Sequence, residues 1–201
     1  MTDLIVLVAD RNAEYLVHGA LSRPEALGIR PVTYKVITHP EHDGGARTSG
    51  VQLLSVQRGS FRRGLLIFDL EGSGSTVAAD VLEQQIDQEL SGFWGDSAKS
   101  IVISPEVDAW LWGSETHMRA VLDWTFPDGI RDWLTAEGFV FSSSGKPERP
   151  KEAFEYACRR ARSARSSKNY RAIAERISFP RCVDPAFARL LATCRQWFPN
   201  S

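Results

Sequence analysis

The sequence has few cysteines and no cysteine motif. Cys158, Cys182 and Cys194 are the only three in 201 residues, and they lie far apart along the chain. An odd number of widely spaced cysteines argues against the disulfide framework of a small secreted domain and indicates buried thiols in a reducing compartment. No pair has the C-x-x-C spacing, so we expect no structural zinc site built on thiolates.

Long hydrophobic runs are missing as well. No apolar segment approaches the roughly 20 residues that a membrane-spanning helix needs. The chain passes from Met1 into an apolar strand without the basic region and small-residue cleavage site of a secretion signal. These absences predict a cytoplasmic protein that has no membrane partner.

The sequence also lacks a phosphate-binding loop and a nucleophile elbow. Ser73 and Ser75 stand in a Gly-Ser-Gly-Ser loop, but this loop lacks the lysine of an NTPase phosphate-binding loop. The G-x-S-x-G elbow of the α/β-hydrolases does not occur either. The sequence therefore argues against both an NTPase and an esterase.

The charge is distributed unevenly along a chain of ordinary globular composition, which is 43% hydrophobic and 24% charged. Residues 1–145 carry 11 Lys and Arg against 20 Asp and Glu, whereas residues 146–201 carry 13 against 5. An acidic body with a basic C-terminal section indicates either internal pairing or an anionic partner. The simplest interpretation is a solvated basic helix face.

Four short apolar runs alternate with helical patterns. The predicted strands cover residues 4–9, 31–38, 64–68 and 100–104. Helical patterns follow at 13–21, 48–56, 77–90, 115–124, 127–136, 150–176 and 185–198. The alternation predicts an α/β fold with about four mostly parallel strands flanked by helices. We expect residues 1–145 to form this domain and residues 146–201 to form a basic helical section packed on it.

Carboxylates follow three of the predicted strands. Asp10 follows the first strand, Asp69 and Glu71 follow the third, and Glu106 and Asp108 follow the fourth. The ends of parallel strands meet at one edge of the sheet, where ligands bind, and carboxylates gathered there repel one another unless a cation lies between them. All five are therefore candidate ligands of Mg²⁺, which prefers carboxylate, water and phosphate oxygens. The alternative is that each acid caps a helix or lies in a solvated turn.

Three motifs carry a resemblance to a known family. They are Val8-Ala9-Asp10-Arg11-Asn12, Ile67-Phe68-Asp69-Leu70-Glu71-Gly72-Ser73-Gly74 and Pro105-Glu106-Val107-Asp108-Ala109-Trp110-Leu111-Trp112. Together they resemble the Toprim family, in which an acid after the first strand and an Asp-x-Asp pair after a later strand bind Mg²⁺. More narrowly, they resemble small Toprim-like proteins of bacterial phage-defence islands, such as the small component of a methylation-associated defence system. The resemblance covers about residues 3–112.

This resemblance implies a Toprim-like fold and a Mg²⁺ or Mn²⁺ cofactor. It assigns Asp10, Asp69 and Glu71 as catalytic residues of a nuclease that acts on phosphodiesters within a multi-protein antiviral defence system. Two departures change the metal geometry, since Asp10 replaces the usual Glu and Asp69-x-Glu71 replaces Asp-x-Asp. The alternative is a non-catalytic interaction or scaffolding subunit of a defence complex.

The segment His39-Pro40-Glu41-His42-Asp43 contains two histidines and two acids within five residues. Three of them could ligate a transition metal, although a His-x-x-His spacing in a loop is a weak signal. Because the loop follows a strand, His42 is also a candidate general acid or base at the acidic edge.

The basic helices and the tryptophans provide candidate interaction surfaces. For nucleic acid the candidates are Arg159, Arg160, Arg162, Arg165 and Lys168. The sequence pI of about 6.4 argues against strong autonomous DNA binding, so docking onto an acidic subunit is an equal alternative. The tryptophans Trp110, Trp112, Trp124 and Trp133 are typical of core packing or a partner interface, with base stacking as the other interpretation.

Overall fold

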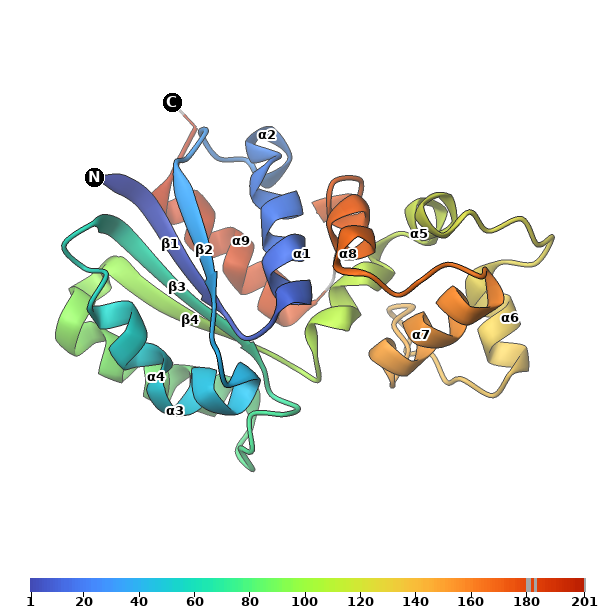
Figure 1. Cartoon of the computed structure of the whole chain (residues 1–201), viewed down its shortest axis with the longest axis horizontal. Coiled ribbons are helices and arrows are strands. Elements are labelled where there is room, and N and C mark those ends of the chain that lie inside the picture. The colour runs from blue at the N-terminus through green and yellow to red at the C-terminus, as the bar shows by residue number, and fades with distance from the viewer. Residues whose placement is uncertain (180–181, 183, 201) are drawn as a thin grey trace.

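The computed structural model describes residues 1–179, 182 and 184–200. A four-stranded sheet contains β1 (Thr2–Val8), β2 (Tyr34–Thr38), β3 (Phe61–Asp69) and β4 (Ala98–Ile103). The strand order is β2-β1-β3-β4, and every neighbouring pair is parallel. The predicted α/β fold with a parallel sheet flanked by helices is thus confirmed (Figure 1).

Helices follow each strand in turn. The first four are α1 (Arg11–Leu21), α2 (Pro24–Leu27), α3 (His42–Ser55) and α4 (Ala79–Trp94). Two 3-10 helices, η1 (Gly95–Ser97) and η2 (Val107–Gly113), flank β4. Next come α5 (Glu115–Leu122), α6 (Ile130–Ala136), α7 (Pro150–Arg160), α8 (Ser167–Ala174) and α9 (Pro185–Trp197).

Helix α3 begins six residues earlier than the predicted start at residue 48. Gly44 and Gly45 indicated a loop because glycine disfavours a helix. At Gly45, however, a Cβ atom would lie 2.3 Å from the ring of His39. Glycine is therefore required by close packing at this position, and the expected loop from His42 onward is the first turn of a helix.

The sheet is buried on both faces. Leu4, Val6 and Val8 of β1 pack with α1 and α9, whereas Ile5 and Leu7 pack with α3 and α4. All five side chains are at most 1% exposed. Because both faces are buried, the sequence of this strand is continuously apolar and does not alternate between apolar and polar residues.

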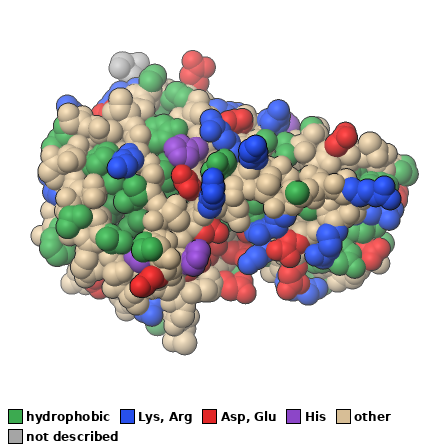
Figure 2. All heavy atoms as spheres, viewed as in Figure 1, with side chains coloured by type: hydrophobic (Ala, Val, Ile, Leu, Met, Phe, Trp, Pro, Cys, Tyr) green, Lys and Arg blue, Asp and Glu red, His purple; other side chains and the backbone are tan. Residues whose placement is uncertain are grey.

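The C-terminal section shares its core with the sheet. Phe154 of α7, Tyr170 of α8 and Phe187 of α9 belong to the same buried cluster as the β1 side chain of Leu4. Helix α8 lies beside α1, and α5 to α7 extend beyond the strand ends (Figure 1). Acidic and basic side chains gather where this helical section meets the sheet-bearing part (Figure 2).

The tryptophans and cysteines are largely internal. Trp110, Trp112 and Trp124 are buried, and Trp133 packs partly buried against the same core. The three cysteines are free and buried, as the sequence predicts. No helix in the described part of the chain has both the length and the apolar character needed to cross a bilayer.

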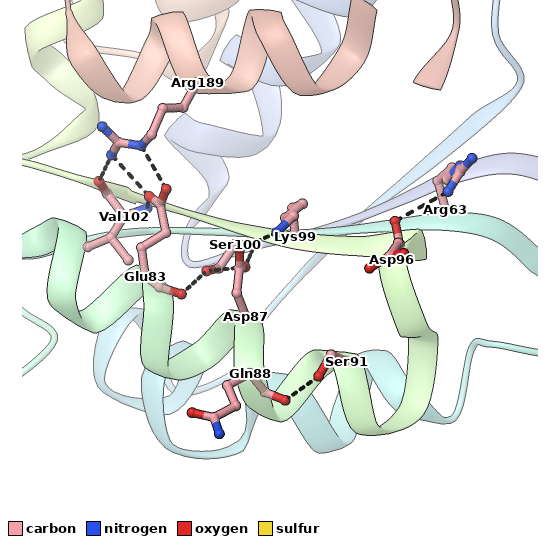
Figure 3. A network of polar contacts seen from close by, with 10 residues as sticks. All are labelled: Arg63, Glu83, Asp87, Gln88, Ser91, Asp96, Lys99, Ser100, Val102 and Arg189. Atoms are coloured by element: carbon pink, nitrogen blue, oxygen red, sulfur yellow. Dashed lines mark hydrogen bonds and ion pairs between the residues drawn. The ribbon is translucent and has the colours of Figure 1, made fainter. Parts of the chain in front are cut away.

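Side chains of α4 cover the outer edge of β4 (Figure 3). The backbone N–H of Ser100 donates to Asp87 Oδ1 at 2.6 Å, and that of Val102 donates to Glu83 Oε2 at 2.8 Å. Arg189 of α9 donates to Glu83 Oε1 at 2.7 Å and to the Val102 carbonyl at 3.2 Å. These three backbone groups on the open side of the edge strand are thus bonded within the molecule, and α9 is bonded to the sheet.

We predict that Gly19→Ala destabilises the protein by about 1–3 kcal/mol, because overpacking forces packed elements apart. A Cβ atom at Gly19 would lie 2.7 Å from both the Cβ atom of Ala174 and the carbonyl oxygen of Arg171 in α8. Thermal unfolding measures the change. Gly92→Ala in α4 is the matched control, since a Cβ atom at that position would meet no neighbour within 4 Å. It should stabilise by about 0.5–1 kcal/mol, and an equal loss in both variants would contradict the prediction.

Candidate functional site

The carboxyl edge of the sheet borders a cavity of about 400 Å³. All five acids predicted from the sequence line it, together with four other acids and three basic residues. The charged lining residues are Asp10, Asp43, Asp69, Glu71, Glu106, Asp108, Glu148, Glu152, Glu155, Arg149, Lys151 and Arg165. The parallel topology therefore brings the predicted carboxylates to one place.

Three aspartates are fixed by the backbone through one carboxylate oxygen each. Asp10 Oδ1 accepts from the N–H of Ala13 at 2.8 Å, so this residue does cap α1. Asp43 Oδ1 accepts from the N–H of Asp69 at 2.8 Å. Asp69 Oδ1 in turn accepts from the N–H of Val107 at 2.9 Å. The second oxygen of each aspartate has no hydrogen-bond donor on another residue in the described part of the chain.

The carboxylates are close enough to affect one another. Burial raises the pKa of Asp69 well above its usual value, and the charges of Asp43, Asp10 and Asp108 raise it further. Burial also raises the pKa of Asp43, with the charge of Asp10 acting in the same direction. Fully ionised, this group is therefore under repulsion that a bound proton or cation relieves.

Glu71 reaches the same cavity because strand-like pairing continues past the end of β3. The N–H of Leu70 donates to the carbonyl of Ile103 at 2.7 Å, and the N–H of Glu71 donates to that of Pro105 at 3.0 Å. Asp69 and Glu71, two residues apart, consequently both line the cavity. Glu71 is solvent-exposed, unlike the half-buried Asp69.

Glu106 holds the start of α7. Its Oε1 atom accepts from the N–H of Lys151 at 2.9 Å, within the first turn of that helix. A carboxylate is favourable at this position because it neutralises the positive end of the helix dipole. Burial nevertheless raises the pKa of Glu106 to about 7, and the charges of Asp108 and Glu71 contribute to the rise.

Asp108 holds α8. It is buried, and its Oδ1 atom accepts from the hydroxyl of Tyr170 at 2.5 Å and from Arg165 Nη2 at 3.3 Å. Burial raises the pKa of Asp108, while the bond from Tyr170 and the charge of Arg165 oppose the rise. Glu106 and Asp108 thus connect the helical section to the sheet, whereas Asp10, Asp69 and Glu71 have no such partner among the described basic side chains.

The predicted nucleic-acid residues are divided between two places. Arg165 lines the acidic cavity and pairs with Asp108 and, at 3.7 Å, with Glu155. A separate hollow of about 530 Å³ is lined by Arg159, Arg160 and Arg162. Lys168 is exposed on α8 and lines neither hollow.

The histidine segment supplies a carboxylate to the site. His39 is buried, with Nε2 at 3.0 Å from Ser49 Oγ and Nδ1 accepting from the N–H of Glu41, so it is a structural residue. His42 lies in the first turn of α3 and is not among the residues that line the cavity. From the sequence, Asp43 was named only within this segment and not among the five candidate Mg²⁺ ligands, although its position shortly after a predicted strand matched theirs.

Within the described residues, no three His, Cys, Asp or Glu side chains form a ready metal coordination group. The carboxylates surround a cavity and do not converge on one point.

We predict that the titration of Glu106 lowers the free energy of unfolding of the protein as pH rises. Native Glu106 keeps its proton up to about pH 7, whereas the unfolded chain loses it near 4.5, so the free energy of unfolding decreases between these values. Glu106→Gln removes this charge and keeps an acceptor for the N–H of Lys151. At pH 8 the variant should be more stable than wild type by about 1–2 kcal/mol, a figure reduced for partial exposure.

Urea unfolding at pH 5 and pH 8 measures the effect of Glu106→Gln. The gain should be clearly smaller at pH 5, where the native carboxyl group is already protonated. The same gain at both pH values would show that ionisation of Glu106 is not its cause.

Comparisons with protein-family models, with curated proteins and with solved structures gave no significant match to this chain.

Proposed function

We propose that the protein is a Mg²⁺-binding, Toprim-like component of a bacterial antiviral defence system and acts as a nuclease on phosphodiesters. One observation carries the proposal. Asp10, Asp43 and Asp69 each have one oxygen fixed by the backbone of another residue and a second without a donor on another described residue, beside a cavity that basic side chains also line. Such an arrangement suits a cation on these carboxylates and a phosphate on Arg149, Lys151 and Arg165, which line the cavity alongside Glu148, Glu152 and Glu155.

The donor set fits a hard divalent cation. Asp10, Asp43, Asp69 and Glu71 offer only carboxylate oxygens, which Mg²⁺ and Mn²⁺ accept together with water. Burial and then repulsion between the carboxylates raise the pKa values of Asp43 and Asp69, and cation binding would relieve the repulsion. A bound divalent ion supplies an activated water molecule and neutralises charge on a phosphate.

The basic side chains of the cavity would bind the phosphate. Lys151 forms no ion pair with any carboxylate in the described ranges, which leaves its ammonium group available for an anion. Arg149 pairs with Glu152 at 2.6 Å at an exposed position, where such pairs are weak and exchange easily. Arg165 is held by Asp108, so its contribution is a fixed positive charge.

The Toprim-like and defence parts of the proposal have different support. Four parallel strands, with Asp10 after β1 and Asp69-Leu70-Glu71 after β3, agree with the Toprim-like pattern. The role in antiviral defence rests on the resemblance of the three sequence motifs.

We predict that Asp69→Asn lowers the affinity for Mg²⁺ and Mn²⁺ by at least about tenfold, as loss of a ligand charge should. Asparagine keeps an oxygen for the N–H of Val107, so the fold should persist. Calorimetry measures binding, and labelled DNA and RNA strands report cleavage, which should fall to background. Asp96→Asn is the control, since Asp96 is exposed at the opposite end of β4. Metal binding unchanged in Asp69→Asn would refute the site.

A second candidate function, a scaffolding subunit, is favoured by an arginine-aromatic surface. The guanidinium of Arg160 lies 4.3 Å from the ring centroid of Phe126 and 5.4 Å from that of Trp133. Arg159 lies 4.9 Å from the ring of Tyr156, which is 37% exposed. Arginine and aromatic residues are enriched at protein interfaces.

The two functions predict different results when copurification and defence activity are measured together in the native host. For a scaffold, replacing both Arg159 and Arg160 with Glu should release the partner proteins, whereas Asp69→Asn should retain them together with defence activity. For a nuclease, Asp69→Asn should abolish defence activity while partners still copurify.

A further inference from the structure

A second charged hollow lies at the amino edge of the sheet. Its volume is about 410 Å³, and it is lined by Met1, Arg30, Arg58, Arg62, Arg63, Ser97, Trp197 and Phe198. No carboxylate side chain is among these residues. Strand β3 has nine residues and connects this edge to the acidic cavity, so the two sites are about 30 Å apart at about 3.3 Å per residue.

Most of the positive charge in this hollow is not neutralised. Arg30 forms a two-pronged pair with Asp3, at 2.9 and 3.3 Å. Arg63 donates only to neutral oxygens, the Asp96 carbonyl and Ser97 Oγ, both at 3.3 Å. Arg58 and Arg62 form no ion pair with any carboxylate in the described part of the chain.

The parallel topology explains why these arginines meet. Arg58 lies in the turn before β3, and Arg62 and Arg63 are near the start of that strand. All four strands begin at this edge, so the loops that precede them gather here, together with the end of α9. The excess of arginine is a property of the edge and not of one helix.

An aromatic platform lies within the same hollow. Trp197, at the end of α9, is partly exposed, and the guanidinium of Arg63 lies 5.3 Å from its ring centroid. Phe198 is buried beneath Arg30 at 5.2 Å. An indole beside one guanidinium group, in a hollow that three other arginines line, can stack with a planar ring whose neighbouring groups are anionic.

We propose that this hollow binds single-stranded nucleic acid, with phosphates on Arg58, Arg62 and Arg63 and a base stacked on Trp197. Guanidinium groups match phosphate oxygens, and an aromatic side chain beside a cationic groove is the usual platform for an unpaired base. A duplex hides its base faces within the stack, so the platform favours a single strand. This site is independent of the proposed metal site and would anchor a strand far from the acidic cavity.

Fluorescence anisotropy with a labelled oligothymidylate of about ten nucleotides tests the proposal. EDTA is present throughout, so metal binding and cleavage do not contribute. Replacing Arg58 and Arg62 together with Gln should weaken binding at least about tenfold. The slope of the logarithm of the binding constant against the logarithm of the salt concentration should also become shallower by about 1.4, which is about 0.7 for each of the two lost phosphate contacts. The control replaces Lys35 and Arg176 with Gln. Both residues are exposed on other surfaces, so the control loses the same amount of positive charge as the Arg58 and Arg62 variant.

Trp197→Leu separates base stacking from charge, because leucine fills part of the same space without a π face. It should weaken oligothymidylate binding about tenfold and leave heparin binding unchanged, with thermal unfolding confirming the fold. Wild-type affinity in the Arg58 and Arg62 variant, or an equal loss in the control, would overturn the site. Unchanged binding in Trp197→Leu, or loss only when Arg159 and Arg160 are replaced, would overturn it as well.

Discussion

Parallel pairing of the four strands is the constraint on which the rest of the structure depends. A parallel sheet must be buried on both faces, so each strand is followed by a helix, and α1 and α9 cover one face while α3 and α4 cover the other. The same pairing directs all strand beginnings to one edge and all strand ends to the opposite edge. Carboxylates accumulate at the ends, arginines at the beginnings, and the two charged hollows are separated by the length of the sheet.

The acidic body and the basic C-terminal section are joined by specific pairs. Asp108 binds Arg165 and Tyr170, and Glu83 binds Arg189 through two short hydrogen bonds. Asp184 accepts a hydrogen bond from Trp110 Nε1 of the body, and it also pairs with Lys146 of its own section while it caps α9. Of the interpretations open for the uneven charge, internal pairing is therefore part of the answer, although the arginines around Phe126 remain outside these pairs.

The sequence predicted the elements whose signals are local. Runs such as Leu4–Val8 identify buried strands, and the acids directly after them are correctly placed at one cavity because strand ends meet in any parallel sheet. Hydrogen bonds between residues that are far apart in the sequence leave no signal in the pattern near either residue. Nothing near Asp108 indicates that Tyr170, 62 residues later, would bind it. Asp43 was named only as part of the predicted histidine loop, whereas it lies in the first turn of α3, where Gly45 packs closely against His39.

The position of α9 has a consequence for protein synthesis. Phe187, Leu190 and Leu191 complete the core over the face of β1 that carries Val6. Strands β1 to β4 are translated more than eighty residues before this helix, so we expect part of this apolar face to stay uncovered until α9 has left the ribosome. Exposed apolar surface of this kind favours aggregation, and in the folded protein α9 covers it, with Arg189 bonded to Glu83.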